Sequence, residues 1–252
     1  MLSDRLSLQL YTVRGELERD FDAALARIAE IGYRQVEPFG LVEFESKLAD
    51  GLAKHGLTAP TTHAGLLGRE LEPAFAAAKR LGIGTVIDPF TDPARWQSAE
   101  EVKQIAVQLN QVAHQAERHG ITIGYHNHHF ELASMLDGRH ALEVFVEHLA
   151  PEVVLEIDTY WAAVGGADVP ALLERLGERV VALHIKDGDG TLNNKAQVAV
   201  GSGTIPVKDF LAAAPGRLAV VELDDFEGEI FDAVSGSYAF LEADFRGEGQ
   251  QA

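Results

Sequence analysis

Short apolar segments alternate with longer amphipathic segments along the whole chain, repeating about every 30 residues. The apolar segments are rich in Val, Ile and Leu, as buried strands are, whereas the amphipathic segments have helical periodicity. This alternation predicts a parallel β-sheet whose strands are joined by helices. Eight strands are expected, at 7–13, 33–39, 57–63, 83–89, 121–128, 153–160, 180–187 and 218–225.

Helices are expected after each of these strands, at 20–32, 43–56, 68–82, 98–120, 138–150, 168–179, 206–216 and 230–245. Several of them end in a glycine directly before the next strand, at Gly32, Gly56, Gly82 and Gly120. A glycine in that place adopts the left-handed conformation that ends a helix and returns the chain to the sheet. These glycines at the ends of predicted helices therefore indicate successive βαβ units.

Charged and polar residues recur on one face of the last three predicted strands, where they are Glu156 and Asp158, His184 and Lys186, and Glu222 and Asp224. An open α/β sheet has helices on both faces and should be apolar on both, whereas the mouth of a barrel tolerates polar side chains. No glycine-rich phosphate fingerprint follows the first strand. We predict one (β/α)₈ TIM barrel over 1–252, with a frayed tail at about 246–252.

The charge balance and the absence of cysteine exclude several classes of function. Lys and Arg total 21 against 39 Asp and Glu, a net charge of −18. So acidic a surface disfavours nucleic acid and anionic membranes as partners. The chain has no cysteine, so disulfides, thiolate ligands and a cysteine nucleophile are excluded. Its first residues contain no apolar run that predicts a signal or membrane span, so a cytoplasmic protein is expected, possibly a homo-oligomer.

Ionisable residues are concentrated at the carboxyl ends of the predicted strands, where barrel enzymes place their active sites. They are Glu37, His63, Asp88, His126, His128, Asp158, His184, Lys186 and Glu222. Such groups cost several kcal/mol each inside a barrel unless they are paired or bound to a cation. The pattern therefore predicts a divalent metal site at this end, built from His, Asp and Glu.

The ends of strands five to eight read YHNHHFE, EIDTYW, LHIKD and VVELD. They resemble those of the xylose-isomerase-like sugar phosphate isomerases and epimerases, which include tagatose 3-epimerases, hydroxypyruvate isomerases and inosose dehydratases. The resemblance covers essentially the whole chain. It implies one divalent ion, Mn²⁺ above Mg²⁺, Co²⁺ or Zn²⁺, with Asp158, His184 and Glu222 as ligands.

Strand five departs from the family pattern, because His126 stands where most relatives have a glutamate. A neutral imidazole also binds such an ion, but it cannot be the second carboxylate of a two-glutamate proton shuttle. The fourth ligand is expected to be His126 or Glu131, or else water or substrate.

Four further side chains and one loop are potential contacts to substrate. Trp161 either stacks on a sugar ring or packs internally, and Lys186 is placed to polarise a carbonyl or stabilise an enediolate oxygen. Glu37 and His63 either bind substrate hydroxyls or support the structure. The loop 199–207 has two glycines, which suit either phosphate capture by backbone amides or an ordinary turn.

The resemblance favours a metal-assisted isomerase or epimerase that abstracts a proton next to the carbonyl of a sugar or sugar phosphate. Glu222 is the expected base, and His128, Lys186 or Glu131 would return the proton. The alternative is an inosose or 3-keto-sugar dehydratase or lyase on the same site, which His126 favours slightly. A phosphodiester nuclease shares the fold but conflicts with the acidic charge, and a catalytically silent sugar-binding barrel is a further alternative.

Overall fold

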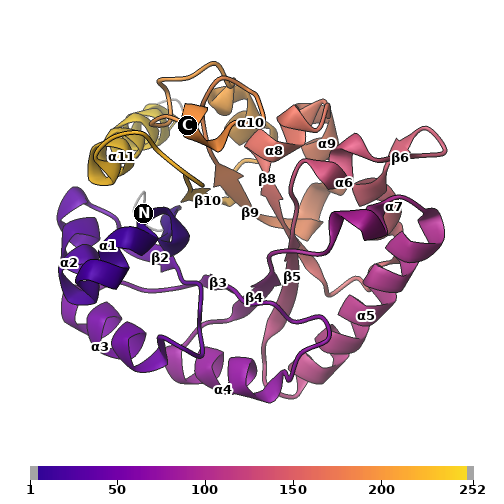
Figure 1. Ribbon diagram of the computed structural model, residues 1–252, viewed down its shortest axis with the longest axis horizontal. Coiled ribbons are helices and arrows are strands. Elements are labelled where there is room, and N and C mark those ends of the chain that lie inside the picture. Colours follow the sequence, from indigo (N-terminus) through magenta and orange to yellow (C-terminus); the bar gives the residue numbers. More distant parts are fainter. Residues whose placement is uncertain (1–4, 249–252) are drawn as a thin grey trace.

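The computed structural model describes residues 5–248, in which eight parallel strands form a ring surrounded by helices (Figure 1). The strands lie in the order β2-β1-β10-β9-β8-β5-β4-β3. They are β1 (Leu6–Gln9), β2 (Gln35–Glu37), β3 (Thr61–His63), β4 (Thr85–Asp88), β5 (Thr122–His126), β8 (Val154–Asp158), β9 (Val180–Ile185) and β10 (Leu218–Val221). All eight predicted strands are confirmed.

Backbone hydrogen bonds join the two ends of this strand order. The amide of Val36 donates to the carbonyl of Thr58 at 2.9 Å, and the amide of His63 donates to the carbonyl of Pro38 at 2.8 Å. The sheet therefore closes on itself between β2 and β3, and the predicted (β/α)₈ barrel is confirmed.

Helices cover the outside of the ring in Figure 1. The long ones are α2 (Phe21–Ile31), α3 (Glu45–His55), α4 (Glu72–Leu81), α5 (Ala99–Glu117), α7 (Ala141–His148), α9 (Val169–Leu176), α10 (Val207–Ala213) and α11 (Ile230–Glu248). Each turns buried apolar residues toward the strands, as the amphipathic pattern predicts. No helix within 5–248 is long and apolar enough to cross a membrane.

The last helix completes the outer ring beside the first ones (Figure 1). The ring of Tyr238 on α11 lies 4.9 Å from that of Tyr33, centroid to centroid. Gly32 ends α2 with φ of 129°, and a Cβ there would come within 2.6 Å of the Tyr238 ring. A side chain at this position would therefore strain the backbone and force the Tyr238 ring to move.

Shorter elements change the predicted ends of several segments. The first strand ends at Gln9 instead of residue 13, because the Gln9 side chain accepts a hydrogen bond from the Tyr11 amide and starts the 3₁₀ helix η2 (Leu10–Val13), followed by α1 (Arg14–Arg19). Strand six ends at Asp158, which caps α8 (Thr159–Val164). The other elements not predicted are α1, η3 (Pro93–Trp96), α6 (Phe130–Ala133), the hairpin of β6 (Met135–Leu136) and β7 (Arg139–His140), and η5 (Asn194–Ala196). The helix predicted at 168–179 ends in the 3₁₀ helix η4 (Gly177–Arg179).

The tail predicted to fray at about 246–252 begins inside the last helix. Helix α11 continues through Glu248, so residues 246–248 are helical, and Arg246 pairs with Glu242 one turn earlier at 2.8 Å. Residues 249–252 lie outside the described part of the chain.

Candidate active site

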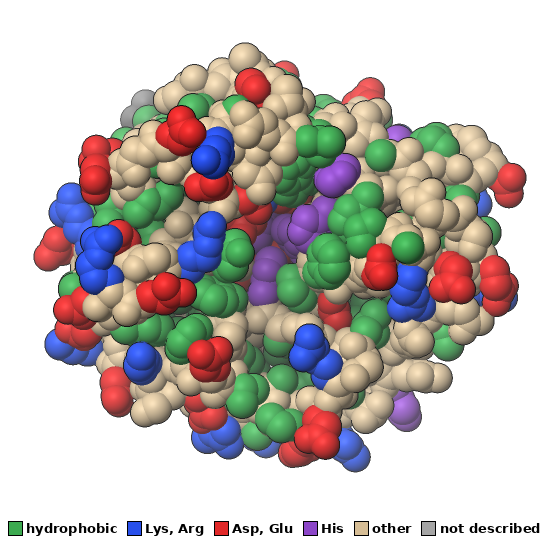
Figure 2. Space-filling view, viewed as in Figure 1, with side chains coloured by type: hydrophobic (Ala, Val, Ile, Leu, Met, Phe, Trp, Pro, Cys, Tyr) green, Lys and Arg blue, Asp and Glu red, His purple; other side chains and the backbone are tan. Residues whose placement is uncertain are grey.

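The carboxyl ends of the strands meet at one hollowed face of the barrel, where histidines and acidic side chains are visible between apolar ones (Figure 2). Most of the predicted site residues converge there and are buried, namely Glu37, His63, His126, Asp158, His184, Lys186 and Glu222. Their ionisable atoms form two groups, one around three imidazoles and one around a lysine.

The first group, which we call the five-donor cluster, consists of Glu37, His63, His126, Glu156 and His184. Oε1 of Glu37 lies 3.2 Å from Nε2 of His63 and 2.8 Å from Nε2 of His184. Oε2 of Glu156 lies 2.7 Å from Nε2 of His63, 3.1 Å from Nδ1 of His126 and 3.0 Å from Nε2 of His184. Four of these residues, all but Glu37, make up one of the two groups whose donor atoms converge closely enough to hold a metal ion.

Sequence reasoning did not select Glu156 as a site residue, although the signal was present. Glu156 precedes Asp158 by two positions on β8, and strand alternation places both side chains inside the barrel. Gln9 was also missed, and its Nε2 donates to Oε1 of Glu37 at 2.7 Å. The layer of polar residues therefore extends one step deeper into the barrel than predicted.

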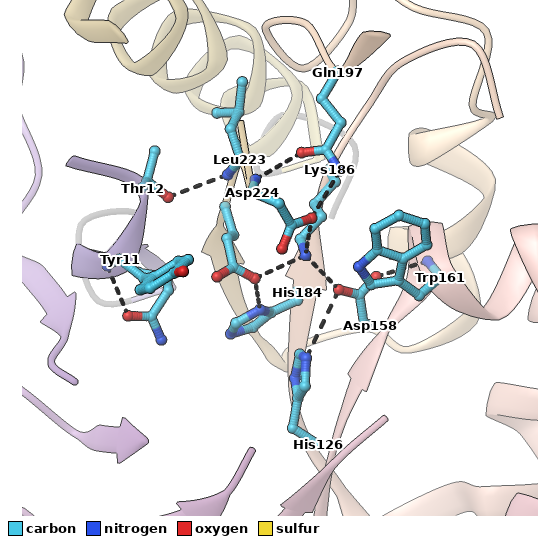
Figure 3. Close-up of polar contacts among 12 residues, drawn as sticks. Tyr11, Thr12, His126, Asp158, Trp161, His184, Lys186, Gln197, Leu223 and Asp224 are labelled. Carbon is cyan, nitrogen blue, oxygen red and sulfur yellow. Dashed lines mark hydrogen bonds and ion pairs between the residues drawn. The ribbon is translucent and has the colours of Figure 1, made fainter. Parts of the chain in front are cut away.

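The second group, which we call the lysine cluster, consists of Lys186, Asp158, Glu222 and Asp224 (Figure 3). Nζ of Lys186 lies 2.9 Å from Oδ2 of Asp158, 2.9 Å from Oε2 of Glu222 and 2.8 Å from Oδ2 of Asp224. Gln197 donates to the same oxygen of Asp224 at 2.7 Å. A buried ammonium thus already neutralises part of the charge of three carboxylates.

Burial and neighbouring charges shift the pKa values of the site residues in different directions. Burial alone would raise the pKa of Glu222, but Lys186 and His184 outweigh it and hold the pKa well below its ordinary value. Burial raises the pKa of Asp158 to about 6 against the opposing charge of Lys186. Burial also lowers the pKa of His128 to about 4, with Lys186 adding to the effect, so this imidazole is neutral at pH 7.

Two imidazoles lie between the clusters and present one nitrogen to each. His184 directs Nε2 toward the five-donor cluster, while its Nδ1 lies 2.7 Å from Oε2 of Glu222. Nε2 of His126 lies 3.9 Å from Oδ2 of Asp158. The predicted ligands His126, Asp158, His184 and Glu222 are accordingly the second group whose donor atoms lie close enough for a metal ion.

Three other predicted residues lie at or beyond the edge of the site. Glu131 accepts hydrogen bonds from the Tyr125 hydroxyl at 2.8 Å and from the His128 amide at 2.9 Å, and it belongs to neither metal-capable group. Trp161 is 5% exposed, and the centroid of its ring lies 5.5 Å from Nζ of Lys186, so the ring covers the lysine. His128 lines the cavity at the mouth, stacked on Phe130.

The glycine loop 199–207 uses its amides internally. Oδ2 of Asp187 accepts from the amides of Gly201 and Gly203, each at 2.9 Å, and Oδ1 accepts from those of Gly188 at 2.8 Å and Ile205 at 3.1 Å. A Cβ on Gly203 would overlap Oδ1 of Asp187 and the Gly188 backbone. A carboxylate of the chain itself therefore occupies the anion-binding position that the sequence suggested for phosphate.

This arrangement predicts a stability effect. Replacing Asp187 with alanine leaves four amides without their charged acceptor, so we expect a loss of about 3 kcal/mol in the free energy of unfolding. Urea denaturation measures the loss. Asp189, two residues after Asp187, is exposed and accepts from Thr191, and its replacement by alanine should cost less than about 1 kcal/mol. Equal losses for the two variants would contradict the assigned role of Asp187.

A cavity of about 650 Å³ opens above the clusters. His63, His126, His128, Glu222 and Asp224 line its inner end. Its outer part is largely apolar and includes Tyr11, Phe39, Leu41, Val42 and Phe90, with Arg69, Glu43 and Glu70 as charged residues. Such a combination of apolar walls and converging polar groups is typical of a small-molecule site.

The protein is thus a TIM barrel with a cavity at one end. Buried imidazole and carboxylate groups there lie close enough together to hold a metal ion. The chain belongs to the xylose isomerase-like TIM barrel family, whose model matches residues 25–216. No curated protein matches the sequence.

Solved structures with the same fold are similar over almost the whole chain. A sugar phosphate isomerase/epimerase from Parabacteroides distasonis is 24% identical with a TM-score of 0.81, covering 94% of this chain and 93% of its own. The IOLI protein, solved with a zinc atom, is 18% identical with a TM-score of 0.71, covering 93% and 95%. A probable 3-DHS dehydratase, AsbF from Bacillus anthracis, is 14% identical with a TM-score of 0.75, covering 94% and 98%. The neighbours are thus mostly enzymes, and they include an isomerase/epimerase and a dehydratase.

Proposed function

We propose that the protein is a divalent-metal-dependent enzyme that isomerises or epimerises a carbonyl sugar through an enediolate. The observation that carries this proposal is an ionised glutamate, Glu222, at the inner end of a cavity whose floor is a dense group of imidazoles and carboxylates. The family and its isomerase and epimerase neighbours support it.

The residues present fit a divalent cation. Imidazole nitrogens and carboxylate oxygens together suit Mn²⁺, Co²⁺ and Zn²⁺, and we propose Mn²⁺ as the ion used. Oε2 of Glu37 and Oε1 of Glu156 are buried and have no hydrogen-bond partner within residues 5–248, as expected of oxygens that serve a cation. A bound cation would polarise the sugar carbonyl and stabilise negative charge on its oxygen.

The side chains of the chain itself account for the proton transfer. Glu222, held ionised by Lys186, takes the proton from the carbon next to the carbonyl. Its return from Glu222 to the former carbonyl carbon, with the hydroxyl proton passing from one oxygen to the other, gives the isomer. A proton from solvent delivered to the opposite face of the original carbon gives the epimer, and Glu222 then releases its proton to solvent. The neutral imidazole of His128 lines the cavity and is assigned as a hydrogen-bond donor to a sugar oxygen. Glu131 does not line this cavity and is left out of the proposed machinery.

Solvent exchange tests the reaction. The protein is stripped with EDTA, reloaded with Mn²⁺ and incubated in D₂O with a panel of ketopentoses, ketohexoses, an inosose and a 3-keto glucoside. We expect NMR to show deuterium at a carbon next to the carbonyl of an intact sugar, and no incorporation after EDTA treatment without reloading. Absence of exchange and of product across the panel, with the metal bound, would contradict the proposal.

A second function is favoured by the cavity, which is larger than a single sugar needs and is apolar in its outer part. In this reaction Glu222 removes the same proton, the bond to a β-oxygen breaks, and water or an alcohol leaves. An inosose or 3-keto glycoside would be the substrate, and a neutral sugar suits the occupied glycine loop better than a phosphorylated one. The same NMR experiment distinguishes this function, since elimination releases water or an aglycone.

A further inference from the structure

We infer that Glu156 positions both imidazoles that face the proposed cation, by fixing which nitrogen of each ring points toward it. The inference rests on the proposed function for one premise, which is that a divalent cation binds at the carboxyl ends of β5, β8, β9 and β10. The metal-capable group there consists of His126, Asp158, His184 and Glu222. Glu156 is not a ligand in this assignment, because it contacts the opposite nitrogen of each ring.

One oxygen of Glu156 contacts both imidazoles. Oε2 lies 3.1 Å from Nδ1 of His126 and 3.0 Å from Nε2 of His184. On the other side of the first ring, Nε2 of His126 lies 3.9 Å from Oδ2 of Asp158 (Figure 3). On the other side of the second ring, Nδ1 of His184 lies 2.7 Å from Oε2 of Glu222. The nitrogen that faces the cation is therefore Nε2 in one ring and Nδ1 in the other.

These contacts determine where each ring keeps its proton when a cation is bound. A carboxylate accepts a hydrogen bond only from a protonated ring nitrogen, and a ligating imidazole carries its one proton on the nitrogen away from the metal. Glu156 thus keeps a proton on Nδ1 of His126 and on Nε2 of His184, and the remaining nitrogens are left to bind the ion. A partner of this kind also holds the ring in its orientation and makes the ligating nitrogen more basic.

Glu156 is the carboxylate whose contacts fit this role among residues 5–248. It is 0% exposed, and its other oxygen, Oε1, has no hydrogen-bond partner in that part of the chain. Its polar contacts are thus with imidazoles alone, the third being Nε2 of His63 at 2.7 Å. Glu37 also contacts Nε2 of His184, at 2.8 Å, but its other imidazole contact is with His63 and not with His126. Glu156 is therefore the one of the two that contacts both metal-facing rings.

Histidine NMR of the unaltered protein tests the assignment directly. Protein labelled with ¹⁵N in its imidazoles is stripped with EDTA and loaded with Zn²⁺, which is diamagnetic, and the ring nitrogens are identified from their couplings to the ring hydrogens. We expect a protonated Nδ1 and a ligating Nε2 for His126, and the reverse for His184. Ligation through Nδ1 of His126 or through Nε2 of His184 would overturn the inference.

Two matched amide substitutions separate positioning from the loss of a buried charge. Glu156→Gln removes the carboxylate that contacts both rings, whereas Glu37→Gln leaves Glu156 to hold both. Isothermal titration of EDTA-stripped protein with Mn²⁺ should show about 10–100-fold weaker binding for Glu156→Gln and less than about 5-fold for Glu37→Gln. The NMR spectrum of Zn²⁺-loaded Glu156→Gln should also show a second tautomer of His126, which Glu37→Gln should not.

Circular dichroism checks that both variants are folded, and the NMR assignment of the unaltered protein decides the inference even where Glu156→Gln does not fold. Equal weakening of Mn²⁺ binding by the two variants, or unchanged binding in folded Glu156→Gln, would overturn the positioning role and leave the proposed function intact. Failure of the unaltered protein to bind any divalent cation would remove both.

Discussion

Replacing Glu222 with glutamine is expected to lower kcat by about 10²–10⁴-fold, the usual contribution of a general base. Glutamine keeps the size of the side chain but cannot take a proton from carbon. Because Glu222 lines the cavity and is held ionised by Lys186, the loss should appear in kcat, and metal titration separates it from a loss of Mn²⁺ affinity. Steady-state kinetics together with metal titration measure the two effects.

The matched control is Glu43→Gln at the outer part of the same cavity, where the side chain is exposed. This variant removes one acidic charge from the cavity without touching either cluster, so its kcat should stay within about twofold of the unaltered enzyme. A Glu222→Gln variant that loses bound Mn²⁺ would instead identify Glu222 as a ligand, as the family resemblance implies. Full activity in that variant would remove its role as base.

The barrel could be predicted from the sequence because the alternation of an apolar strand with an amphipathic helix repeats eight times. Strand ends were less predictable, since side chains determine them locally. Gln9 stops β1 by accepting a hydrogen bond from the Tyr11 amide, and Asp158 stops β8 by capping α8. Neither hydrogen bond changes the apolar pattern from which the strands were predicted to continue to residues 13 and 160.

The sequence predicts which residues at the strand ends face the barrel interior. It does not predict which of these residues contact one another. Alternation places Glu156, Asp158, His184 and Lys186 inside the barrel, yet it does not say which atoms meet. Only the three-dimensional structure places Lys186 between carboxylates of β8 and of the segment after β10. The family resemblance implies a role for Asp158 but none for Glu156, which lies deeper in the barrel.

Replacing Lys186 with methionine is expected to destabilise the EDTA-treated protein by about 3–5 kcal/mol, because it removes one partner from a buried ionic group. The ammonium is 1% exposed and lies within 2.9 Å of oxygens from Asp158, Glu222 and Asp224. Methionine fills similar space but removes the ammonium that three carboxylates share, which leaves Glu222 with only His184 as a counter-charge. Lys195, which is exposed, is the control, and its replacement by methionine should change stability by less than about 0.5 kcal/mol.

The same Lys186→Met variant should also bind a cation more tightly. Without the ammonium, Asp158 and Glu222 face His184 with no lysine charge between them, so Mn²⁺ should bind more tightly among these residues than in the unaltered protein. Urea denaturation in EDTA and in excess Mn²⁺ measures the effect, and at 100 times the Kd the ion should restore about 2.7 kcal/mol. A variant as stable as the unaltered protein in EDTA would show that Lys186 does not balance these carboxylates. Tighter Mn²⁺ binding by the variant than by the unaltered protein would show that the lysine and an ion compete for this position.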